Sequence, residues 1–160
     1  MGPAWKTLLF SVAAPGTVAA VIPSLLLHGR VQPVPRGAAV AGLALVALGA
    51  AGYIVCALDF VVTGRGTPAP LDPPRTLVAS RLYRFTRNPM YVAVLLALFG
   101  ETIALGSVTL LVYSLMIALL FHLFVVLYEE PALRDRFGPS YDGYCAAVPR
   151  WLPRPHRAAG

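Results

Sequence analysis

The chain has 160 residues, of which 58% are hydrophobic and only 12% are charged, and its mean hydropathy is +0.70. A soluble domain typically has about 25% charged and about 45–50% apolar residues, so the composition argues against a soluble protein and favours an integral membrane protein. The net charge of +6 does not require a nucleic-acid partner, because membrane topology and attraction to anionic lipid headgroups also explain it.

Four apolar runs follow one another, and three of them reach the roughly 20 residues that cross a bilayer core of about 30 Å. We expect membrane-spanning helices over residues 7–27, 37–58, 89–105 and 109–128. The third run is shorter and contains Glu101, but only Gly106 and Ser107 separate it from the fourth, which predicts a tight helical hairpin. The expected fold is therefore all-α, a polytopic membrane bundle of about four transmembrane helices in a single domain, residues 1–160.

The first run also permits interpretation as a signal peptide, with Lys6 as its positive end. Its apolar stretch is longer than the usual h-region of about 7–15 residues, which favours a span. Pro15 and Pro23 are compatible with a span, because neighbouring helices can satisfy the freed backbone groups.

Orientation follows from the basic residues. Two of them, Arg30 and Arg36, lie after the first run, and the other eleven lie before it, in the loop 59–88 or in the tail 129–160. Excess Lys and Arg marks the cytoplasmic side, so we predict a multi-pass protein of the plasma (cytoplasmic) membrane with both termini in the cytoplasm.

The third run begins with the sequence RNPMY, residues 87–91. Pro89 suits the first turn of a helix and Asn88 is a good N-cap, so we predict a helix start here. The positive dipole end and Arg87 together favour an anion, such as a carboxylate or phosphate. The alternative is a capped helix whose arginines reach lipid phosphates.

Glu129 and Glu130 stand at the expected C-terminus of the fourth span, where the helix dipole disfavours negative charge. A cationic or hydroxyl-rich partner would relieve that cost; alternatively, Pro131 begins a new helix whose first turn suits the acids. His122, seven residues earlier, is expected on the same helix face, about 10 Å deeper, either facing a cavity or bonding a neighbouring helix.

An antiparallel hairpin brings both polar ends to one side of the membrane. Arg87, Asn88 and Tyr91 then approach the two acids, with His122 beneath them. A pocket with an anion-binding half and a cation-binding half suits a zwitterionic ligand.

The motifs RNPMY, H-x6-EEP and FG-x-x-Y-x-x-Y, followed by VPRW, resemble the isoprenylcysteine carboxyl methyltransferase-like family of integral membrane methyltransferases. Related membrane phospholipid methyltransferases share the pattern. The resemblance covers residues 66–151, and it departs from the eukaryotic members at Asn88, where they have histidine, and at Ala93, where glycine is frequent.

The resemblance implies S-adenosylmethionine as cofactor and no metal. The residues implied to bind the cofactor are Arg87, Asn88, Pro89, Tyr91, His122, Glu129 and Glu130. Tail residues are expected to fold back over the pocket and bind the acceptor, namely Arg134, Tyr141, Tyr144, Arg150 and Trp151. Of these, Arg150 is expected to position an acceptor carboxylate, and for an amine acceptor Glu130 or His122 would take the proton. The alternative for the VPRW segment is an interfacial anchor.

Two further features have two interpretations each. The small residues of the second span, Ala38/Gly42 and Ala47/Ala51, serve internal packing, which we favour, or a dimer face. Glu101 bonds Tyr113 or Ser114 across the hairpin, which we favour, or lines a lipid tunnel.

The cysteines lie too far apart in depth to pair, with Cys56 in the second span and Cys145 in the tail, and no spacing suggests a metal site.

The sequence thus predicts a methyltransferase that uses S-adenosylmethionine at the cytoplasmic face. Its acceptor is a lipophilic or prenylated molecule, with a prenylcysteine, a phospholipid amine and another isoprenoid all compatible. Membrane lipids are expected partners, nucleic acid is not, and the oligomeric state stays open. The alternatives are an NADPH-dependent sterol-type reductase and a non-catalytic bundle or transporter subunit.

Overall fold

The computed structural model describes residues 12–27, 32–59, 62, 79 and 81–152. Within these residues every regular element is helical, which confirms the all-α class for this part of the chain. In chain order the elements are η1 (Val12–Val21), α2 (Ile22–Leu27), α3 (Arg36–Asp59), η3 (Arg81–Arg84), α4 (Pro89–Leu105), α5 (Val108–Phe124), η4 (Val125–Glu129), α6 (Glu130–Phe137) and α7 (Pro139–Ala147).

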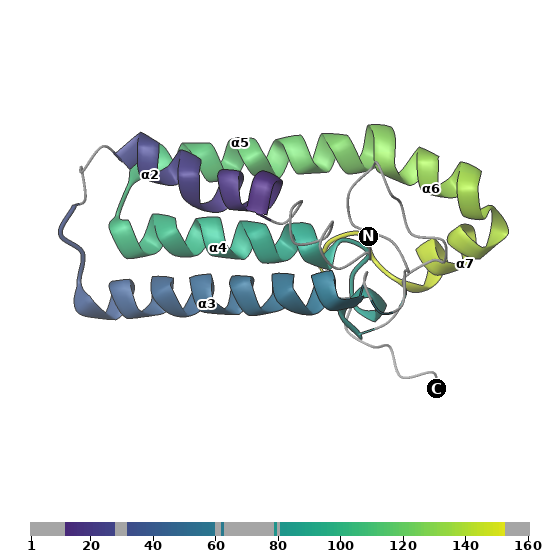
Figure 1. Cartoon of the computed structure of the whole chain (residues 1–160), viewed down its shortest axis with the longest axis horizontal. Helices are drawn as coiled ribbons and strands as arrows, with labels where there is room; N and C mark the ends of the chain where they lie inside the picture. Colours follow the sequence, from purple (N-terminus) through teal and green to yellow (C-terminus); the bar gives the residue numbers. More distant parts are fainter. Residues whose placement is uncertain (1–11, 28–31, 60–61, 63–78, 80, 153–160) are drawn as a thin grey trace.

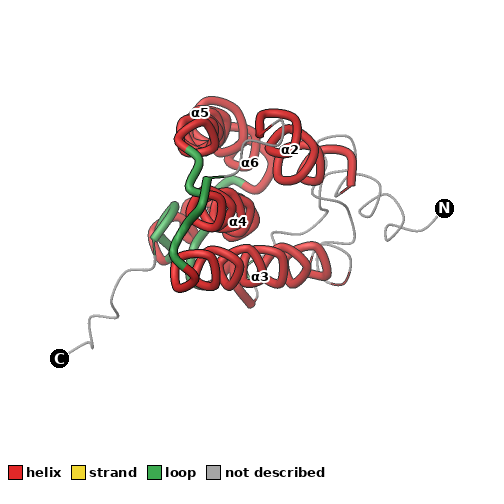
Figure 2. Tube along the Cα trace, turned by 90° about the vertical axis from the view of Figure 1, so that its left-hand side faces the viewer, coloured by secondary structure: helices red, strands yellow, loops and turns green. Residues whose placement is uncertain are grey.

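Helix α4 is the centre of the bundle (Figures 1 and 2). Helix α3 packs along one side of it and α5 along the other, and α2 lies beside α5. Residues at the start of the expected first span, 7–11, lie outside the described part of the chain.

Among the described residues, two helices are long and apolar enough to cross a membrane, Arg36–Asp59 and the continuous helix Val108–Phe137. The apolar helices Pro15–Leu27 and Pro89–Leu105 are shorter. The bundle is therefore compatible with a membrane protein, and the count of four spans stays a prediction.

The contact between α3 and α4 depends on glycine. A Cβ on Gly42 would lie 2.5 Å from the carbonyl oxygen of Gly100, and one on Gly49 would lie 2.5 Å from that of Ala93. The two backbones therefore touch, as small residues permit in membrane helices. Internal packing is confirmed for Gly42, whereas Ala47 and Ala51 are exposed and do not contribute to this contact.

The predicted hairpin is present, since α4 and α5 run antiparallel and only Gly106 and Ser107 lie between them (Figure 1). Gly106 has the left-handed φ of 59°, which glycine adopts without a steric penalty. The hydroxyl oxygen of Ser107 accepts a hydrogen bond from the backbone N–H of Leu110 at 3.3 Å and so caps α5.

The predicted helix end at the acid pair was wrong. Helix α5 continues through the π-helical turn η4 into α6 and reaches Phe137. In this wide turn the N–H of Glu130 donates to the carbonyl of Val125, five residues back. A proline clashes with the carbonyl four residues before it, and for Pro131 that carbonyl, on Leu127, lies inside the widened turn, which accommodates the ring.

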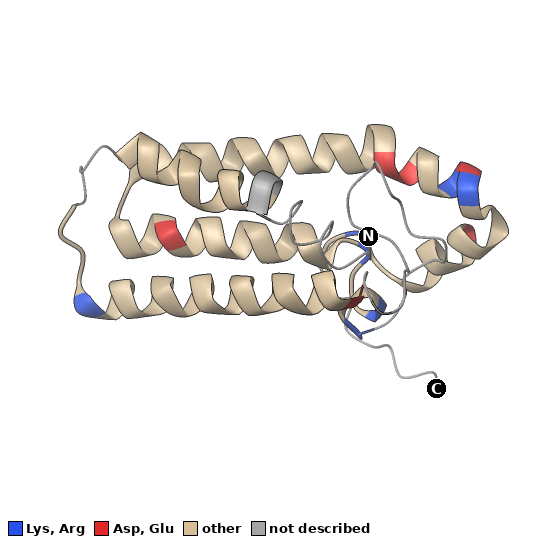
Figure 3. Cartoon of the chain, in the orientation of Figure 1, with Lys and Arg blue, Asp and Glu red and all other residues tan. Residues whose placement is uncertain are grey.

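Charged residues gather at one end of the bundle, around α6, α7 and the end of α3 (Figure 3). The exceptions within the described residues are Arg36, which begins α3, and Glu101 in α4. Other basic residues used to predict orientation lie outside the described part of the chain, namely Lys6, Arg30, Arg65, Arg75, Arg154 and Arg157.

Candidate active site

Asn88 and Pro89 begin α4 as predicted, but Asn88 does not cap it. Its side chain makes no capping bond, and its Nδ2 instead donates to the carbonyl oxygen of Arg150 at 3.0 Å. The hydroxyl of Thr86 donates to the same oxygen, also at 3.0 Å. The cap prediction was wrong because a tail carbonyl 62 residues away accepts the amide instead.

The tail folds back onto the start of α4, as predicted. The backbone N–H of Arg87 donates to the carbonyl of Pro149 at 2.9 Å, and the Tyr144 hydroxyl donates to the carbonyl of Tyr83 at 2.6 Å. Together with the two bonds to Arg150, these contacts join residues 83–88 to residues 144–150. We call this set of contacts the tail clamp.

Glu130 lies between two arginines from opposite sides of the clamp. Arg150 binds it with two parallel hydrogen bonds, Nε to Oε1 at 2.6 Å and Nη2 to Oε2 at 2.9 Å. Nη1 of Arg87 lies 3.2 Å from Oε1. The Glu130 side chain is only 10% exposed, so these are well-shielded, charge-assisted contacts that tie α6, the tail and the start of α4 together.

Glu129 has a different environment. Its Oε2 accepts a hydrogen bond from the Tyr91 hydroxyl at 2.8 Å, and the Tyr91 ring packs against Phe121 with centroids 4.7 Å apart. Within the described residues, no arginine forms an ion pair with Glu129. The two adjacent acids are thus distinct: Glu130 is neutralised by arginines, whereas Glu129 has a neutral hydroxyl partner.

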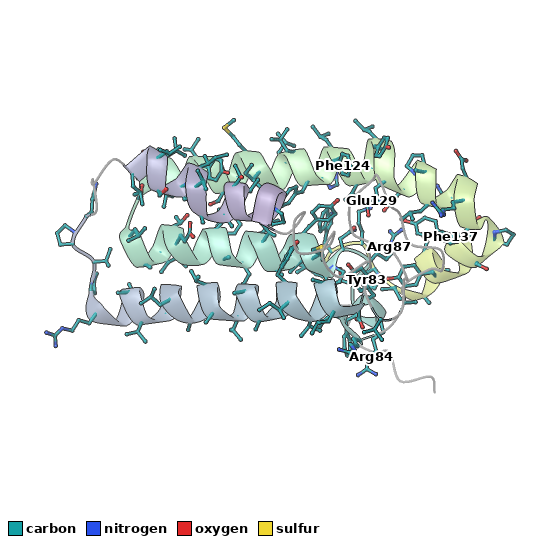
Figure 4. The ribbon with its side chains drawn as sticks, viewed as in Figure 1. Tyr83, Arg84, Arg87, Phe124, Glu129 and Phe137 are labelled. Atoms are coloured by element: carbon teal, nitrogen blue, oxygen red, sulfur yellow. The ribbon has the colours of Figure 1, made fainter. Side chains whose placement is uncertain are left out.

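Arg87 has one side-chain N–H without a hydrogen-bond partner. Its Nη1 also donates to the Cys145 sulfur at 2.6 Å, while its buried Nε has no hydrogen-bond partner. A buried unpaired donor is costly, so this N–H is suited to an incoming anionic group. Figure 4 shows Arg87 and Glu129 on the facing sides of the α4 start and the α5–α6 helix.

His122 does not share the face of Glu129, contrary to the prediction from the seven-residue spacing. His122 is exposed, and its Nδ1 accepts a hydrogen bond from the Trp151 indole N–H at 3.2 Å. The spacing argument assumed 3.6 residues per turn, but the intervening η4 has a wider turn that rotates each residue less. Trp151 thus hydrogen-bonds α5, and the interfacial-anchor alternative for its segment stays a prediction.

The predicted tail residues separate into two groups. Tyr141 and Tyr144 lie on α7, where Tyr141 is 2% exposed and Tyr144 makes one of the clamp contacts. Burial is the largest cause that raises the pKa of both phenols; the nearby Arg87 lowers it in part and Cys145 raises it, so both phenols stay protonated. Arg134 instead pairs with Asp142 at 2.8 Å, with both side chains about half exposed, and its acceptor-binding role stays a prediction.

Sequence reasoning missed three members of the clamp, Tyr83, Thr86 and Cys145. Tyr83 and Thr86 belong to the polar run YRFTRNPMY, which could have suggested them. Both cysteines are free, as predicted.

Glu101 lies far from this cluster, near the hairpin turn, and the bonds expected for it are not formed. The Tyr113 hydroxyl donates to the carbonyl of Val18 at 2.8 Å, and the Ser114 hydroxyl donates to that of Leu110 at 2.7 Å. The buried Oε2 of Glu101 has no hydrogen-bond partner, because both hydroxyls donate to backbone carbonyls instead, so the favoured interpretation of Glu101 was wrong.

A model of the phospholipid methyltransferase family matches residues 38–140. The matched segment runs from α3 to the start of α7 and includes Arg87, Tyr91 and both acids, while Arg150 and Trp151 lie beyond it. No curated protein and no solved structure matches the chain.

Proposed function

Because the chain belongs to the phospholipid methyltransferase family, we propose that it transfers a methyl group from S-adenosylmethionine to a lipophilic acceptor. The match confirms the resemblance to membrane methyltransferases that the RNPMY and EEP motifs indicated. It favours a methyltransferase over the sterol-type reductase and over a non-catalytic bundle.

One observation carries the proposal: the start of α4 and the acids of the α5–α6 helix form a single polar cluster. S-adenosylmethionine has a carboxylate, an ammonium, a ribose and, when bound, supplies a methyl group activated by its sulfonium. The unpaired Nε of Arg87 suits the carboxylate. Glu129, on the facing helix, suits the ammonium or the ribose hydroxyls.

The two acids take different roles in this proposal. Glu130 already has two guanidinium partners, so we assign it to holding Arg87 and Arg150 in place. Glu129 keeps carboxylate capacity beyond its bond from Tyr91, so we assign it the cationic or hydroxyl end of the cofactor. This narrows the prediction from the sequence, in which both acids bound the cofactor.

The acceptor side is built around Arg150. Nε and Nη2 are committed to Glu130, and the side chain remains 35% exposed, so its outer N–H groups are left for an acceptor carboxylate or phosphate. A carboxylate paired with two arginines is a weak base, so Glu130 is not favoured as the proton acceptor. Alignment of donor and acceptor supplies much of the acceleration in a displacement of this kind. We propose that the acceptor reaches this side from the bilayer and the cofactor from the cytoplasm.

The test is calorimetric titration of the full-length protein in detergent with S-adenosylhomocysteine and, separately, with NADPH. Binding of S-adenosylhomocysteine alone supports the methyltransferase. Binding of NADPH alone overturns the methyltransferase proposal in favour of a reductase. Binding of neither ligand overturns the proposal that this cluster is a cofactor site. Asp135→Asn, on the exposed side of α6, is a control that should bind like the unaltered protein.

A further inference from the structure

One buried acid lies outside the cluster. Asp59, the last residue of α3, is 1% exposed, and neither carboxylate oxygen accepts a hydrogen bond. Its ionic partner is Arg81, whose Nε lies 3.0 Å from Oδ1 and whose side chain is 53% exposed. A buried carboxylate at a helix C-terminus costs free energy, because the charge loses its hydration and lies at the negative end of the helix dipole. We therefore asked which contacts of Asp59 could offset this cost.

The partner of Asp59 is also conformationally unusual. Arg81 has a φ of 47°, and it is the non-glycine residue with positive φ in the part of the chain that the structure describes. Side chains other than glycine rarely adopt this region, which persists where surrounding contacts hold it. Arg81 is the first residue of η3, so the ion pair joins the start of η3 to the end of α3.

Helix η3 connects this ion pair to the tail clamp. Tyr83 is buried against Cys56 of α3, one turn before Asp59, with Met90 packed against both. Its carbonyl accepts the Tyr144 hydroxyl, and Thr86, two residues beyond η3, donates to the carbonyl of Arg150. The path therefore runs from the end of α3 through η3 to the tail.

We propose that Asp59 is a positioning residue: by holding Arg81 it sets η3, to which the tail carrying Arg150 is clamped. The effect of Asp59 on ligand binding rests on the proposed function, whereas the effect of Asp59 on tail docking does not. The proposal thus makes two separate predictions, one for tail docking and one for affinity.

Tail docking is measured by the rate at which a maleimide modifies Cys145, followed by peptide mass spectrometry. Cys145 lies against Arg87 within the clamp, and Cys56 is 0% exposed and does not compete. Asp59→Asn, which keeps the shape and removes the charge, should raise the rate by about fivefold or more, because local opening governs access. The exposed Asp135→Asn should leave it unchanged. An unchanged rate in Asp59→Asn overturns the proposal.

A double variant separates this path from general loosening. Tyr144→Phe removes the hydroxyl that donates to Tyr83, so it opens the same clamp. If Asp59 acts through that contact, Asp59→Asn/Tyr144→Phe labels about as fast as the faster single variant. If the labelling rate of the double variant instead rises by the product of the two single increases, the two residues act independently, and the proposed path is overturned.

Affinity for S-adenosylhomocysteine completes the test. In Asp59→Asn it should fall about tenfold while the protein stays monodisperse, because local opening undocks the tail from the start of α4. Faster labelling with unchanged affinity overturns the role in positioning the site. If the unaltered protein binds no S-adenosylhomocysteine, the proposed function fails, and the labelling rate alone still decides the link to the tail. If Asp59→Asn does not fold, Arg81→Lys, which keeps the charge and loses the Nε contact, takes its place under the same criteria.

Discussion

The α3–α4 contact and the tail clamp both join segments that are distant in sequence, but they do so with different chemistry. In the first, backbones touch at Gly42, Gly49 and Gly100, and no room remains for a side chain. In the second, hydrogen bonds and ion pairs centred on Glu130 hold the tail to the start of α4. Polar contacts can be exchanged for those of a ligand, whereas backbone packing cannot. The comparison therefore separates a fixed scaffold from a region able to bind.

The largest effect is expected at the scaffold. Gly49→Leu would force side-chain atoms into the backbone of α4, where a Cβ already lies 2.5 Å from the Ala93 carbonyl and 2.8 Å from the Ala97 nitrogen. Overpacking typically costs about 1–3 kcal/mol and more against backbone, so we expect loss of the folded, monodisperse protein on size-exclusion chromatography. Gly37→Leu makes the same change where nothing lies within 4 Å, and it should leave the elution unchanged.

The next effect is expected at the centre of the clamp. Glu130→Gln leaves Arg87 and Arg150 without their shared carboxylate. Breaking a buried ion pair costs about 3–5 kcal/mol, and we expect about 3 because Arg150 is partly exposed. Thermal unfolding should show the loss, and hydrogen exchange should rise at residues 144–151 but not in α3. Equal exchange in both regions would contradict the separation of clamp and scaffold.

Asn88→Asp should have a smaller effect. It replaces the amide donor to the Arg150 carbonyl with an oxygen that repels it, while the Thr86 bond remains. A lost bond with an unsatisfied buried acceptor costs about 1–3 kcal/mol. Faster maleimide labelling of Cys145 is the expected readout, and a rate equal to that of the unaltered protein would contradict it.

The smallest effect is expected at the end of the tail. Trp151→Phe keeps an aromatic ring near His122 and removes one exposed hydrogen bond of 3.2 Å. A hydrogen bond contributes about 1 kcal/mol net, so the unfolding temperature should fall by a few degrees at most. A fall as large as that of Glu130→Gln would show that the tail is held by Trp151 rather than by the ion cluster.

The sequence correctly predicted the structural features that depend only on residues adjacent in the chain. The proline at the start of α4 and the Gly106-Ser107 hairpin are correct because both depend on a few adjacent residues. The cap at Asn88 and the helix end at Glu129 are wrong, because a distant carbonyl takes the amide and a π-helical turn carries the helix through Pro131.

The polar partners within the site were the least predictable feature. Sequence motifs placed Arg87, Glu129 and Glu130 together. Only the structure shows that Arg150 hydrogen-bonds Glu130 and that Tyr91 hydrogen-bonds Glu129. The sequence places Asp59 in the loop 59–88, where an exposed side chain is expected. Its burial could not be predicted, because it depends on η3, which follows some twenty residues later. Such contacts leave no periodic trace in the sequence.

The most direct test compares the affinity for S-adenosylhomocysteine of Glu129→Gln with that of the unaltered protein. Hydrogen bonds to charged groups contribute about 1.5–3 kcal/mol, so we expect the affinity to fall by at least about tenfold with little change in unfolding temperature. Asp135→Asn, an exposed change of the same kind, should keep the affinity. An unchanged affinity in Glu129→Gln would contradict the assignment of this cluster as the cofactor site.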